Sequence, residues 1–418
     1  MSELHERTRA VLPSWLSLYY EDPIELDHGS GRHVWDADGT RYLDFFGGIL
    51  TTMTEHALPA VTEAVAAQAA KIIHSSTLYL NRPMVELCEE IAAVSDIPDA
   101  KVFLTTSGTE ANDAALLLAS TRNGANQVLA LRNSYHGRSF STIGITGNSA
   151  WSPTSLSPFQ VYYVHGGQRF RSPFAALSDE DFIAACVADL EDVLDQTNGR
   201  IAALIAEPIQ GVGGFTSGPD GLLGAFAEVL RAHDILWISD EVQTGWGRTG
   251  EHFWGWQAHC ADHPGHTPDI VTFAKGIGNG LSMAGVIAPA SIMDNLPANS
   301  ISTFGGSPIT SAGALANLRH LRAHDLQGNA AKVGPILLDG LKALDLPHVL
   351  DVRGKGLMIG VELDTPARAT AVLQGCKDRG LLVGKGGLRG NVLRIAPPLS
   401  LTADEAHEGL AILTEALQ

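Results

Sequence analysis

The stretch Ile235-Leu-Trp-Ile-Ser-Asp-Glu-Val-Gln-Thr-Gly245 decides the fold, together with Asp269-Ile-Val-Thr-Phe-Ala-Lys275 further along the chain. Each begins with a short apolar run, rich in β-branched and aromatic residues, that leads to a charged side chain. Such runs predict buried strands, and a charged residue at the end of a buried strand is a candidate for function. Asp240 and Lys275 are therefore expected at two strand ends, and Lys275 is followed by the glycines of Gly276-Ile-Gly-Asn-Gly280.

A lysine that leaves a buried strand among glycines places its amine in a crevice. Burial lowers the pKa of an amine and makes it a nucleophile for carbonyl groups. Pyridoxal phosphate needs both residues, because its aldehyde condenses with a lysine and its ring nitrogen needs a carboxylate partner. Taken alone, Asp240 is more simply a helix cap and Lys275 a solvated charge. The interpretation depends on what accompanies them.

Composition limits the classes of function. With 418 residues, 45% hydrophobic and 18% charged, the chain predicts a compact protein of two domains. The net charge of −18 argues against nucleic acid or an anionic membrane as the main partner. The N-terminal stretch lacks a basic-then-apolar signal pattern, and no apolar run reaches membrane-spanning length, so we expect a cytoplasmic protein. Scattered cysteines without CxxC spacing fit reduced thiols: Cys88, Cys186, Cys260 and Cys376.

Between residues 101 and 290, short apolar runs alternate with helical stretches, which is typical of an α/β fold with a mostly parallel sheet covered on both faces. Ligands bind such sheets at the carboxyl ends of the strands. The predicted strands are 102–104, 128–131, 201–206, 235–238, 270–273 and 285–288, with helices at 110–120 and 222–233 between some of them.

The flanking parts of the chain predict a smaller domain. Residues 1–35 are expected to be irregular, followed by a hairpin that turns at Asp38-Gly39 and by helices over 59–73 and 84–94. A helix from 311 to about 323 leads to strands at 357–363, 381–383 and 392–395 and a terminal helix from about 403. We divide the chain into residues 1–50, part of the small domain; 51–310, the large cofactor-binding domain; and 311–418, the C-terminal α+β part of the small domain with its connecting helix.

Further strand ends carry polar or aromatic side chains. Ser107-Gly108-Thr109 follows the first strand and opens a helix, which predicts an anion site for a phosphate, although Ser or Thr at this place is often only a cap. Tyr135 and His136 follow the second strand, where an aromatic ring can stack on a planar heterocycle or simply pack in a loop. Glu207 ends the third strand and is held extended by the proline after it, so it can orient a neighbour near the cofactor.

Two residues next to Asp240 complete the predicted cofactor site. Gln243 is placed to reach the ring hydroxyl, and Val242 is placed to cover one face of the ring. Together the motifs resemble the class III aminotransferases, a family of fold type I pyridoxal-phosphate enzymes, over nearly all of the chain. The resemblance rests on Ser107-Gly-Thr-Glu-Ala-Asn, Tyr135-His-Gly-Arg, Glu207-Pro-Ile-Gln-Gly, Asp240-Glu-Val-Gln-Thr-Gly-Trp-Gly-Arg-Thr-Gly, Ala274-Lys-Gly, Ser302-Thr-Phe-Gly-Gly-Ser-Pro and Arg394-Ile-Ala-Pro-Pro-Leu.

Within this class, Phe45-Phe-Gly-Gly-Ile and the segment 79–83 are most similar to the alanine–glyoxylate aminotransferase branch, which in turn is similar to ethanolamine-phosphate lyases. The resemblance implies that Phe46 and Tyr79 contact the substrate and that Arg394 grips its α-carboxylate, a task suited to a guanidinium. One departure is Glu55-His-Ala-Leu-Pro59, where many relatives have Gly-His-x-His-Pro. It lies near the expected substrate entrance and bears on amine specificity.

The resemblance also implies roles for the cofactor residues. Lys275 forms the Schiff base with pyridoxal 5'-phosphate and later moves the proton, while Asp240 keeps the ring nitrogen protonated. Thr303 comes from a partner subunit to bind the phosphate, so the active unit is a homodimer, with a tetramer possible. The cofactor-binding set is Ser107, Gly108, Thr109, Tyr135, His136, Glu207, Asp240, Val242, Gln243, Lys275 and Thr303.

The resulting hypothesis is an aminotransferase that moves an amino group from an amino acid or amine to a 2-oxo acid, glyoxylate or pyruvate, by ping-pong chemistry. The alternative is a lyase on the same scaffold that eliminates a β substituent, such as phosphate, and releases ammonia. A binding protein that has lost the chemistry is disfavoured because Asp240, Gln243 and Lys275 are retained. The His- and Cys-rich stretch 259–266 lacks zinc-finger spacing, and we interpret it as a solvated loop without a metal.

Overall fold

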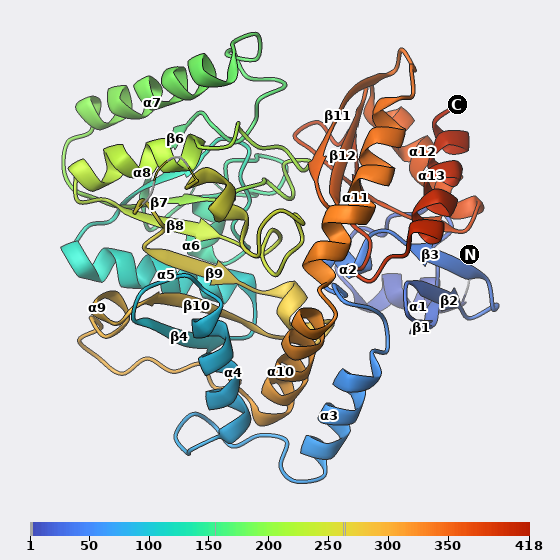
Figure 1. The fold of residues 1–418 in the computed structure, drawn as a ribbon, viewed down its shortest axis with the longest axis horizontal. Coiled ribbons are helices and arrows are strands. Elements are labelled where there is room, and N and C mark those ends of the chain that lie inside the picture. The colour runs from blue at the N-terminus through green and yellow to red at the C-terminus, as the bar shows by residue number, and fades with distance from the viewer. Residues whose placement is uncertain (1–2, 155, 262, 264) are drawn as a thin grey trace.

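A seven-stranded sheet forms the centre of the large domain (Figure 1), as seen in the computed structural model, which describes residues 3–154, 156–261, 263 and 265–418. The strand order is β4-β10-β9-β8-β7-β5-β6. β10 runs antiparallel to both of its neighbours, whereas the other neighbouring pairs are parallel. The predicted mostly parallel sheet is confirmed. Its strands are β4 (Ala100–Thr105), β5 (Gln127–Leu131), β6 (Gln160–Val164), β7 (Ile201–Ala206), β8 (Leu236–Asp240), β9 (Ile270–Phe273) and β10 (Ala284–Pro289).

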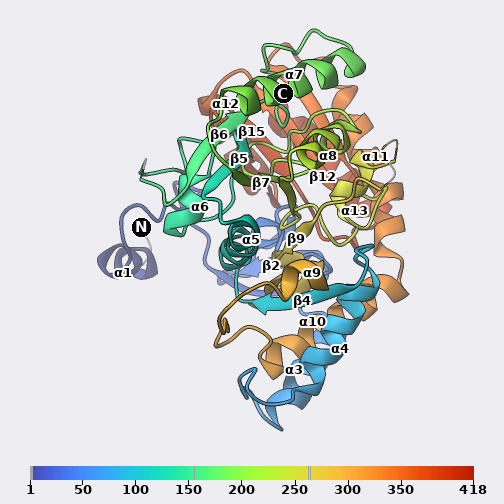
Figure 2. The same cartoon turned by 90° about the vertical axis from the view of Figure 1, so that its left-hand side faces the viewer.

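Helices cover both faces of this sheet, because alternate residues of its strands point to opposite sides. Leu129 and Leu204 face one buried cluster, which includes residues of α7 (Asp179–Gln196) and α8 (Leu222–Ala232). Val128 and Ile205 face the other, which includes residues of α5 (Gly108–Asn123). In Figures 1 and 2, α7 and α8 accordingly lie on one side of the sheet and α5 on the other.

The two ends of the chain build the small domain together. In its first sheet, of order β1-β2-β3-β13, the C-terminal strand β13 pairs in parallel with β3. Its second sheet has the order β11-β12-β15-β14. The strands are β1 (Leu26–Ser30), β2 (His33–Asp36), β3 (Arg41–Asp44), β11 (Val349–Lys355), β12 (Met358–Leu363), β13 (Leu381–Leu382), β14 (Gly384–Gly386) and β15 (Val392–Ile395). The helices α11 (Leu326–Lys342) and α12 (Pro366–Asp378) pack against strands, and α13 (Ala403–Leu417) packs against these two helices.

A long helix connects the two domains. This helix, α10 (Pro308–Ala323), packs against α3 (Pro59–Ala69) and α4 (Arg82–Ala93) and is followed by α11 (Figure 1). The predicted helix from 311 to 323 is confirmed, and it begins three residues earlier with Pro308 at its first turn, where proline is favoured because its missing N–H has no helical partner. Short elements complete the fold: α2 (Gly47–Leu50), α6 (Phe140–Gly144), α9 (Ala290–Met293), η1 (Gly255–His259) and η2 (Lys275–Gly278).

Two local predictions were wrong. Residues 1–35 are not irregular throughout, since they contain α1 (Glu3–Val11) and β1; α1 buries no residue and lies at the edge of the molecule in Figure 2. The stretch 259–266 is not simply solvated, because His259 is buried and its Nδ1 lies 3.5 Å from the Leu223 amide at the start of α8. Residues 262 and 264 of this stretch lie outside the described residues.

Metal-binding groups and membrane-spanning helices are both absent from the described residues. No group of three or more His, Cys, Asp or Glu side chains among them is placed to hold a metal ion. None of the helices in the described ranges combines the length and the apolar character that crossing a bilayer requires.

Candidate active site

The carboxyl ends of β8 and β9 bring Asp240 and Lys275 to the same edge of the central sheet. The two strands are parallel neighbours, and Asp240 is the register partner of Thr272. Two residues beyond the end of β9, Lys275 opens η2 with a φ of 47°, a left-handed conformation that a residue with a side chain rarely adopts. Backbone strain of this kind persists only where surrounding contacts fix it, and it is concentrated at functional sites.

The carboxylate of Asp240 is buried, with 3% of its surface exposed, and is held by a network of hydrogen bonds. Its Oδ2 accepts from Asn112 Nδ2 at 2.8 Å and lies 2.8 Å from His136 Nδ1, while Oδ1 accepts from the Val242 amide at 3.2 Å. Asn112 in turn accepts from the Thr272 hydroxyl at 2.7 Å. These contacts fix the orientation of the carboxylate before any ligand binds.

Asn112 is a site residue that the sequence interpretation missed, although it lies within a quoted motif. Its amide also donates to the His136 carbonyl at 2.8 Å, so it ties the loop after β5 to Asp240. The one signal in the sequence is a polar residue at an inward position of α5, among buried Ala111, Ala115 and Leu116. A buried amide at such a position requires partners.

The amine of Lys275 lies in an electrostatic environment that disfavours its charge. Burial, with the positive charge of Arg394 as the second cause, lowers the pKa of Lys275 below its ordinary value, and the carboxylates of Asp240 and Glu207 oppose this only in part. A larger fraction of the amine is therefore unprotonated near neutral pH than for a surface lysine. An unprotonated amine can attack a carbonyl carbon and can accept a proton.

The side chain of Glu207 accepts hydrogen bonds from two loops around the site and holds them in place. Its Oε1 accepts from the Tyr135 amide at 2.9 Å and its Oε2 from the Gly211 amide at 2.8 Å. The side chain is buried, and burial together with the charge of Asp240 raises its pKa. Through the first contact it fixes Tyr135, whose ring meets Trp151 edge to face at 5.6 Å between centroids.

The N-terminus of α5 provides a place for an anion. Ser107 caps this helix by accepting from the Glu110 amide at 3.2 Å, and Gly108 and Thr109 form its first turn. A side chain at Gly108 would lie 2.9 Å from a methyl of Val242, so glycine is required for this close approach. Free N–H groups at the start of a helix of this length bind phosphate or carboxylate groups.

Arg394 lies in β15 of the small domain, with only 3% of its surface exposed, and reaches the same site. Its Nη2 donates to Gln243 Oε1 at 2.8 Å, and its buried Nε has no hydrogen-bond partner. Within the described part of the chain no carboxylate forms an ion pair with it. A buried guanidinium without a carboxylate is costly unless a ligand supplies one.

Aromatic rings enclose this guanidinium. The Arg394 carbon Cζ lies 5.4 Å from the ring centre of Phe46 and 4.7 Å from that of Phe215. Phe46, which was predicted, also meets the ring of Tyr19 at 5.6 Å. Phe215 and Tyr19 were missed, because no motif marks them and only the fold brings residues from distant parts of the chain to Arg394.

Tyr79 and Thr303 are not brought to this site within one chain. Both are exposed, Tyr79 to 71%, and no hydrogen bond or ring contact in the described residues joins either of them to Lys275 or Arg394. Their assigned roles stay predictions. The arrangement as a whole brings together an amine of lowered pKa, a fixed carboxylate, the N-terminus of α5 and a guanidinium.

The family model for aminotransferase class-III matches residues 19–417. The chain belongs to the class III aminotransferases. It is 40% identical to a mitochondrial alanine–glyoxylate aminotransferase 2 homologue of Arabidopsis thaliana, over 96% of this chain and 84% of that protein. Among solved structures, it is similar to a phospholyase from Arthrobacter in complex with phosphoethanolamine, with a TM-score of 0.90, 31% identity and 99% of both chains covered. It is equally similar to a PLP-bound amine transaminase from an uncultivated Pseudomonas species, with a TM-score of 0.90, 30% identity and 97% of both chains covered.

Class III aminotransferases depend on pyridoxal phosphate, and the residues of this aminotransferase fit that cofactor. Asp240 would face the protonated ring nitrogen as a fixed buried carboxylate, Lys275 would supply the amine for the aldehyde, and the start of α5 would hold the phosphate. When bound, pyridoxal phosphate supplies an aldehyde that condenses with amines and a ring that withdraws electrons from the attached carbon. In the structure Gln243 contacts Arg394, so its predicted contact with the ring hydroxyl stays a prediction.

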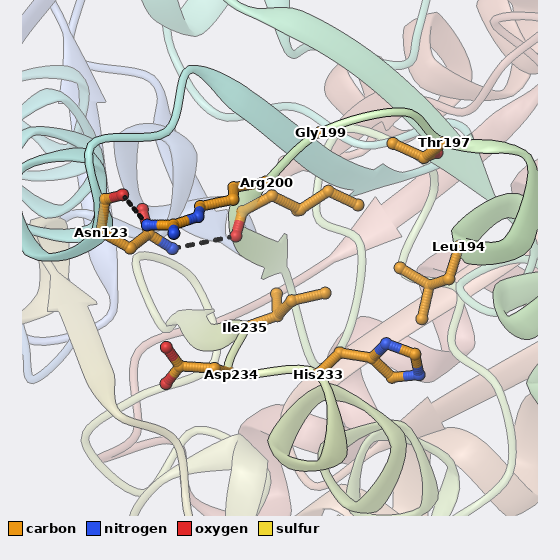
Figure 3. A pocket seen from close by; sticks show the side chains of 9 residues that line it. Asn123, Leu194, Thr197, Gly199, Arg200, His233, Asp234 and Ile235 are labelled. Carbon is orange, nitrogen blue, oxygen red and sulfur yellow. Dashed lines mark hydrogen bonds between the residues drawn. The ribbon is translucent and has the colours of Figure 1, made fainter.

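A separate pocket of about 370 Å³ lies at the opposite edge of the sheet (Figure 3). It is lined by Ile201 and Ile235 at the amino ends of β7 and β8 and by Arg200, which lies beside Asn123. Because Asp240 and Lys275 lie at the carboxyl ends of the strands, this pocket plays no part in the aminotransferase site.

Proposed function

We propose that this aminotransferase uses Lys275 as the amine that holds the cofactor and carries the transferred proton, and that Arg394 binds the carboxylate of the 2-oxo acid and of an amino-acid donor. The amino group passes from an amino acid or amine to a small 2-oxo acid, glyoxylate or pyruvate. Similarity to alanine–glyoxylate aminotransferase 2 homologues supports this choice of acceptor.

The proposal rests on the surroundings of the Arg394 side chain. Its charge is buried, and among the described residues its side chain bonds only to the neutral amide of Gln243, with its Nε left without a partner there. Its positive charge also lowers the pKa of Lys275, after the larger effect of burial, which indicates that the two groups share one site. A carboxylate beside this guanidinium would complete its hydrogen bonds.

The roles of the other residues follow from where their atoms lie. Asp240, held by Asn112 and His136, keeps its carboxylate in one orientation and can hold a proton on a ring nitrogen. Lys275 can take a proton at Nζ and return it, because its pKa is lowered toward the working range of a general base. Tyr135 is fixed beside them through Glu207.

Arg394 gives the most direct test. Arg394→Met keeps much of the side-chain volume and removes the charge, so we expect kcat/KM for glyoxylate and pyruvate to fall by about 100-fold or more, as for the loss of a buried charged hydrogen bond. The half-reaction with an amine donor that has no carboxylate should change far less. If the kinetics with both oxo acids stayed native, Arg394 would not be the carboxylate site.

The elimination alternative is not favoured, because the family match and the alanine–glyoxylate relatives point to transamination. The Arthrobacter phospholyase shares the fold, so the fold alone does not separate the two reactions. Mixing the holoenzyme with single amine donors, without an oxo acid, distinguishes them. Transamination changes the visible band of the cofactor without releasing ammonia, and pyruvate or glyoxylate restores it. Catalytic release of ammonia with the band restored would indicate the lyase.

A homodimer is part of the proposal, and the exposed surface around Tyr79 and Thr303 supports it. The segment before α4 is tied to the segment before α10, since Asn81 donates to the Gly306 carbonyl at 2.8 Å and His74 meets the ring of Phe304 at 5.2 Å. Large exposed apolar surfaces mark sites of association. The exposed large hydrophobic residues of the two segments are Ile72, Ile73, Leu78, Tyr79, Leu80, Ile301 and Phe304.

A further inference from the structure

A buried amide underlies the turn that carries Lys275. Asn317, on the inner face of α10, is fully buried, and its Nδ2 donates to the carbonyls of Gly276 at 2.9 Å and Ile277 at 3.0 Å. These are the two residues directly after Lys275 in η2. One amide group therefore uses both of its hydrogens on the turn whose first residue has a φ of 47°.

The acceptor side of the same amide is also occupied. Its Oδ1 accepts from the hydroxyl of Thr54 at 2.5 Å, and Thr54 is as fully buried as Asn317. The carbonyls of Gly276 and Ile277 fix which way the amide points, because a carbonyl can accept only from the nitrogen, whereas the hydroxyl of Thr54 can donate or accept. With the NH₂ group facing η2, the Thr54 hydroxyl donates to Oδ1 and holds the amide in this place.

Thr54 holds the end of the turn as well. Its backbone N–H donates to Asn279 Oδ1 at 2.9 Å, and Asn279 Nδ2 donates to the Glu55 carbonyl at 2.9 Å. Asn279 follows η2 and has a φ of 46°, so left-handed residues lie both at the start of the turn and just after it. A side chain at Gly276 would lie 2.3 Å from the sulfur of Met53, so the segment 53–55 packs directly against the turn.

We propose that Asn317 and Thr54 are positioning residues for Lys275: they hold η2 in its strained conformation and thereby aim the lysine amine. The proposal rests on the proposed role of Lys275 as the reacting amine. It assigns a function to the segment that precedes Glu55-His-Ala-Leu-Pro59, the part of the chain that departs from the common pattern of relatives. It also connects the interdomain helix α10 to the reaction through one side chain.

Matched variants of Thr54 and Asn317 distinguish a role in positioning Lys275 from a role in packing alone. Thr54→Val keeps the shape and removes the hydroxyl, whereas Thr54→Ser keeps the hydroxyl. Asn317→Asp keeps the shape and removes the NH₂ donors. Ser400→Ala is the control, because Ser400 donates to the Thr54 carbonyl at 2.7 Å and does not bond to the side-chain amide of Asn317.

The experiment uses holoenzyme of each variant and follows the visible cofactor band after mixing with a saturating amino donor. We expect Thr54→Val to slow this half-reaction about 10-fold and Asn317→Asp about 100-fold, as for a misplaced catalytic group, with the half-saturating donor concentration unchanged. Thr54→Ser and Ser400→Ala should stay within about twofold of the native rate. The pH midpoint of the visible band should move in Thr54→Val but not in Thr54→Ser.

Two further outcomes decide the proposal. If Thr54→Val and Asn317→Asp lower the melting temperature but keep the native rate and pH midpoint, the amide serves packing only and the proposal is wrong. Borohydride reduction of the native holoenzyme, with peptide mapping, tests the premise separately. If the cofactor label is not on the Lys275 peptide, the proposed function fails whatever the variants show. If the label is there and the variants behave as native, only the positioning role fails.

Discussion

Arg394 donates a hydrogen bond of 2.8 Å to the side-chain oxygen of Gln243, so a neutral amide holds this buried guanidinium. A carboxylate at this place would pair with the arginine, whereas an amide fixes its direction and leaves its charge for a ligand. We therefore expect the identity of residue 243 to govern how strongly an anionic substrate is bound.

Gln243→Glu should turn this contact into an internal ion pair. The KM for glyoxylate is expected to rise about 10-fold or more, because a hydrogen bond to a charged group is worth about 1.5–3 kcal/mol. Steady-state kinetics with varied acceptor measure the change. Gln196→Glu adds the same charge on the exposed part of α7 and serves as the control. A native KM in Gln243→Glu would contradict the role given to Arg394.

Lys275→Ala should remove turnover while the fold persists. We expect a loss in kcat of about 10³-fold or more, as when a group that acts covalently is deleted. Circular dichroism and a melting curve check that the protein is folded. Lys342→Ala, at an exposed position of α11, is the matched control and should keep native activity. Near-native turnover of Lys275→Ala would exclude the proposed mechanism.

The pH dependence of the half-reaction should follow the amine of Lys275. Burial and the charge of Arg394 lower the pKa of this lysine, so the rate should rise with pH and level off below 10.5, the ordinary value. Arg394→Met removes the second of these causes and should move the midpoint to higher pH. A donor without a carboxylate isolates this effect from substrate binding. A midpoint that stays in place would show that Arg394 does not act on the amine.

Glu241 links stability to pH. Its buried carboxylate accepts from the Gly255 and Trp256 amides at 2.9 and 2.7 Å, yet burial raises its pKa from 4.5 to about 7. The protonated form therefore favours the folded state: its contribution to stability is complete below pH 4.5 and is lost as the pH rises through about 7.

Glu241→Gln should weaken this pH dependence between 4.5 and 7. It should also lower the free energy of unfolding at pH 5 by about 1–3 kcal/mol, because a buried N–H group loses its acceptor. Denaturant unfolding at several pH values measures both effects. Glu63→Gln, at an exposed position of α3, should change neither. An unchanged slope would show that Glu241 is ionised in the folded protein over the whole range.

Leu80→Asp tests the homodimer. Leu80 is fully exposed in the single chain, beside Tyr79, and we expect a charge there to shift the protein toward monomers in light scattering. Activity should fall with the dimer, because Thr303 is expected to act from a partner subunit. Leu26→Asp places the same change on exposed β1 and should leave the assembly intact. A monomeric native protein with full activity would contradict this part of the proposal.

Much of the central sheet could be predicted because its strands are apolar runs that end in chemically distinctive residues. All six predicted strands of the large domain are present, and the residues at their ends converge as expected. β6 was missed because it is an edge strand, hydrogen-bonded on one side only, whose sequence Gln160-Val-Tyr-Tyr-Val is only partly buried. α1 was missed because it buries no residue and its sequence is mostly polar.

The parts of the site that could not be predicted depend on contacts between distant segments. Phe215 has no motif, yet it covers Arg394 because its segment lies against the small domain, where Arg353 donates to the Gly214 carbonyl at 2.8 Å. In the sequence, nothing distinguishes Asn317 from an ordinary polar residue of a helix. Its partners Gly276 and Ile277 come from another element, and only the packing of α10 brings them together.

The parallel pairing of β3 with β13 has a consequence for synthesis on the ribosome. Leu43 lies beside Leu381, so β3, which is synthesised early, can complete its pairing only after β13 has been made. The strands of the large sheet all lie between these two segments, and they can pair while translation continues. Arg394 is made later still. Asp240 and Lys275 are therefore synthesised before Arg394, and the arginine that we propose to bind the oxo acid joins them only after β15 has been made.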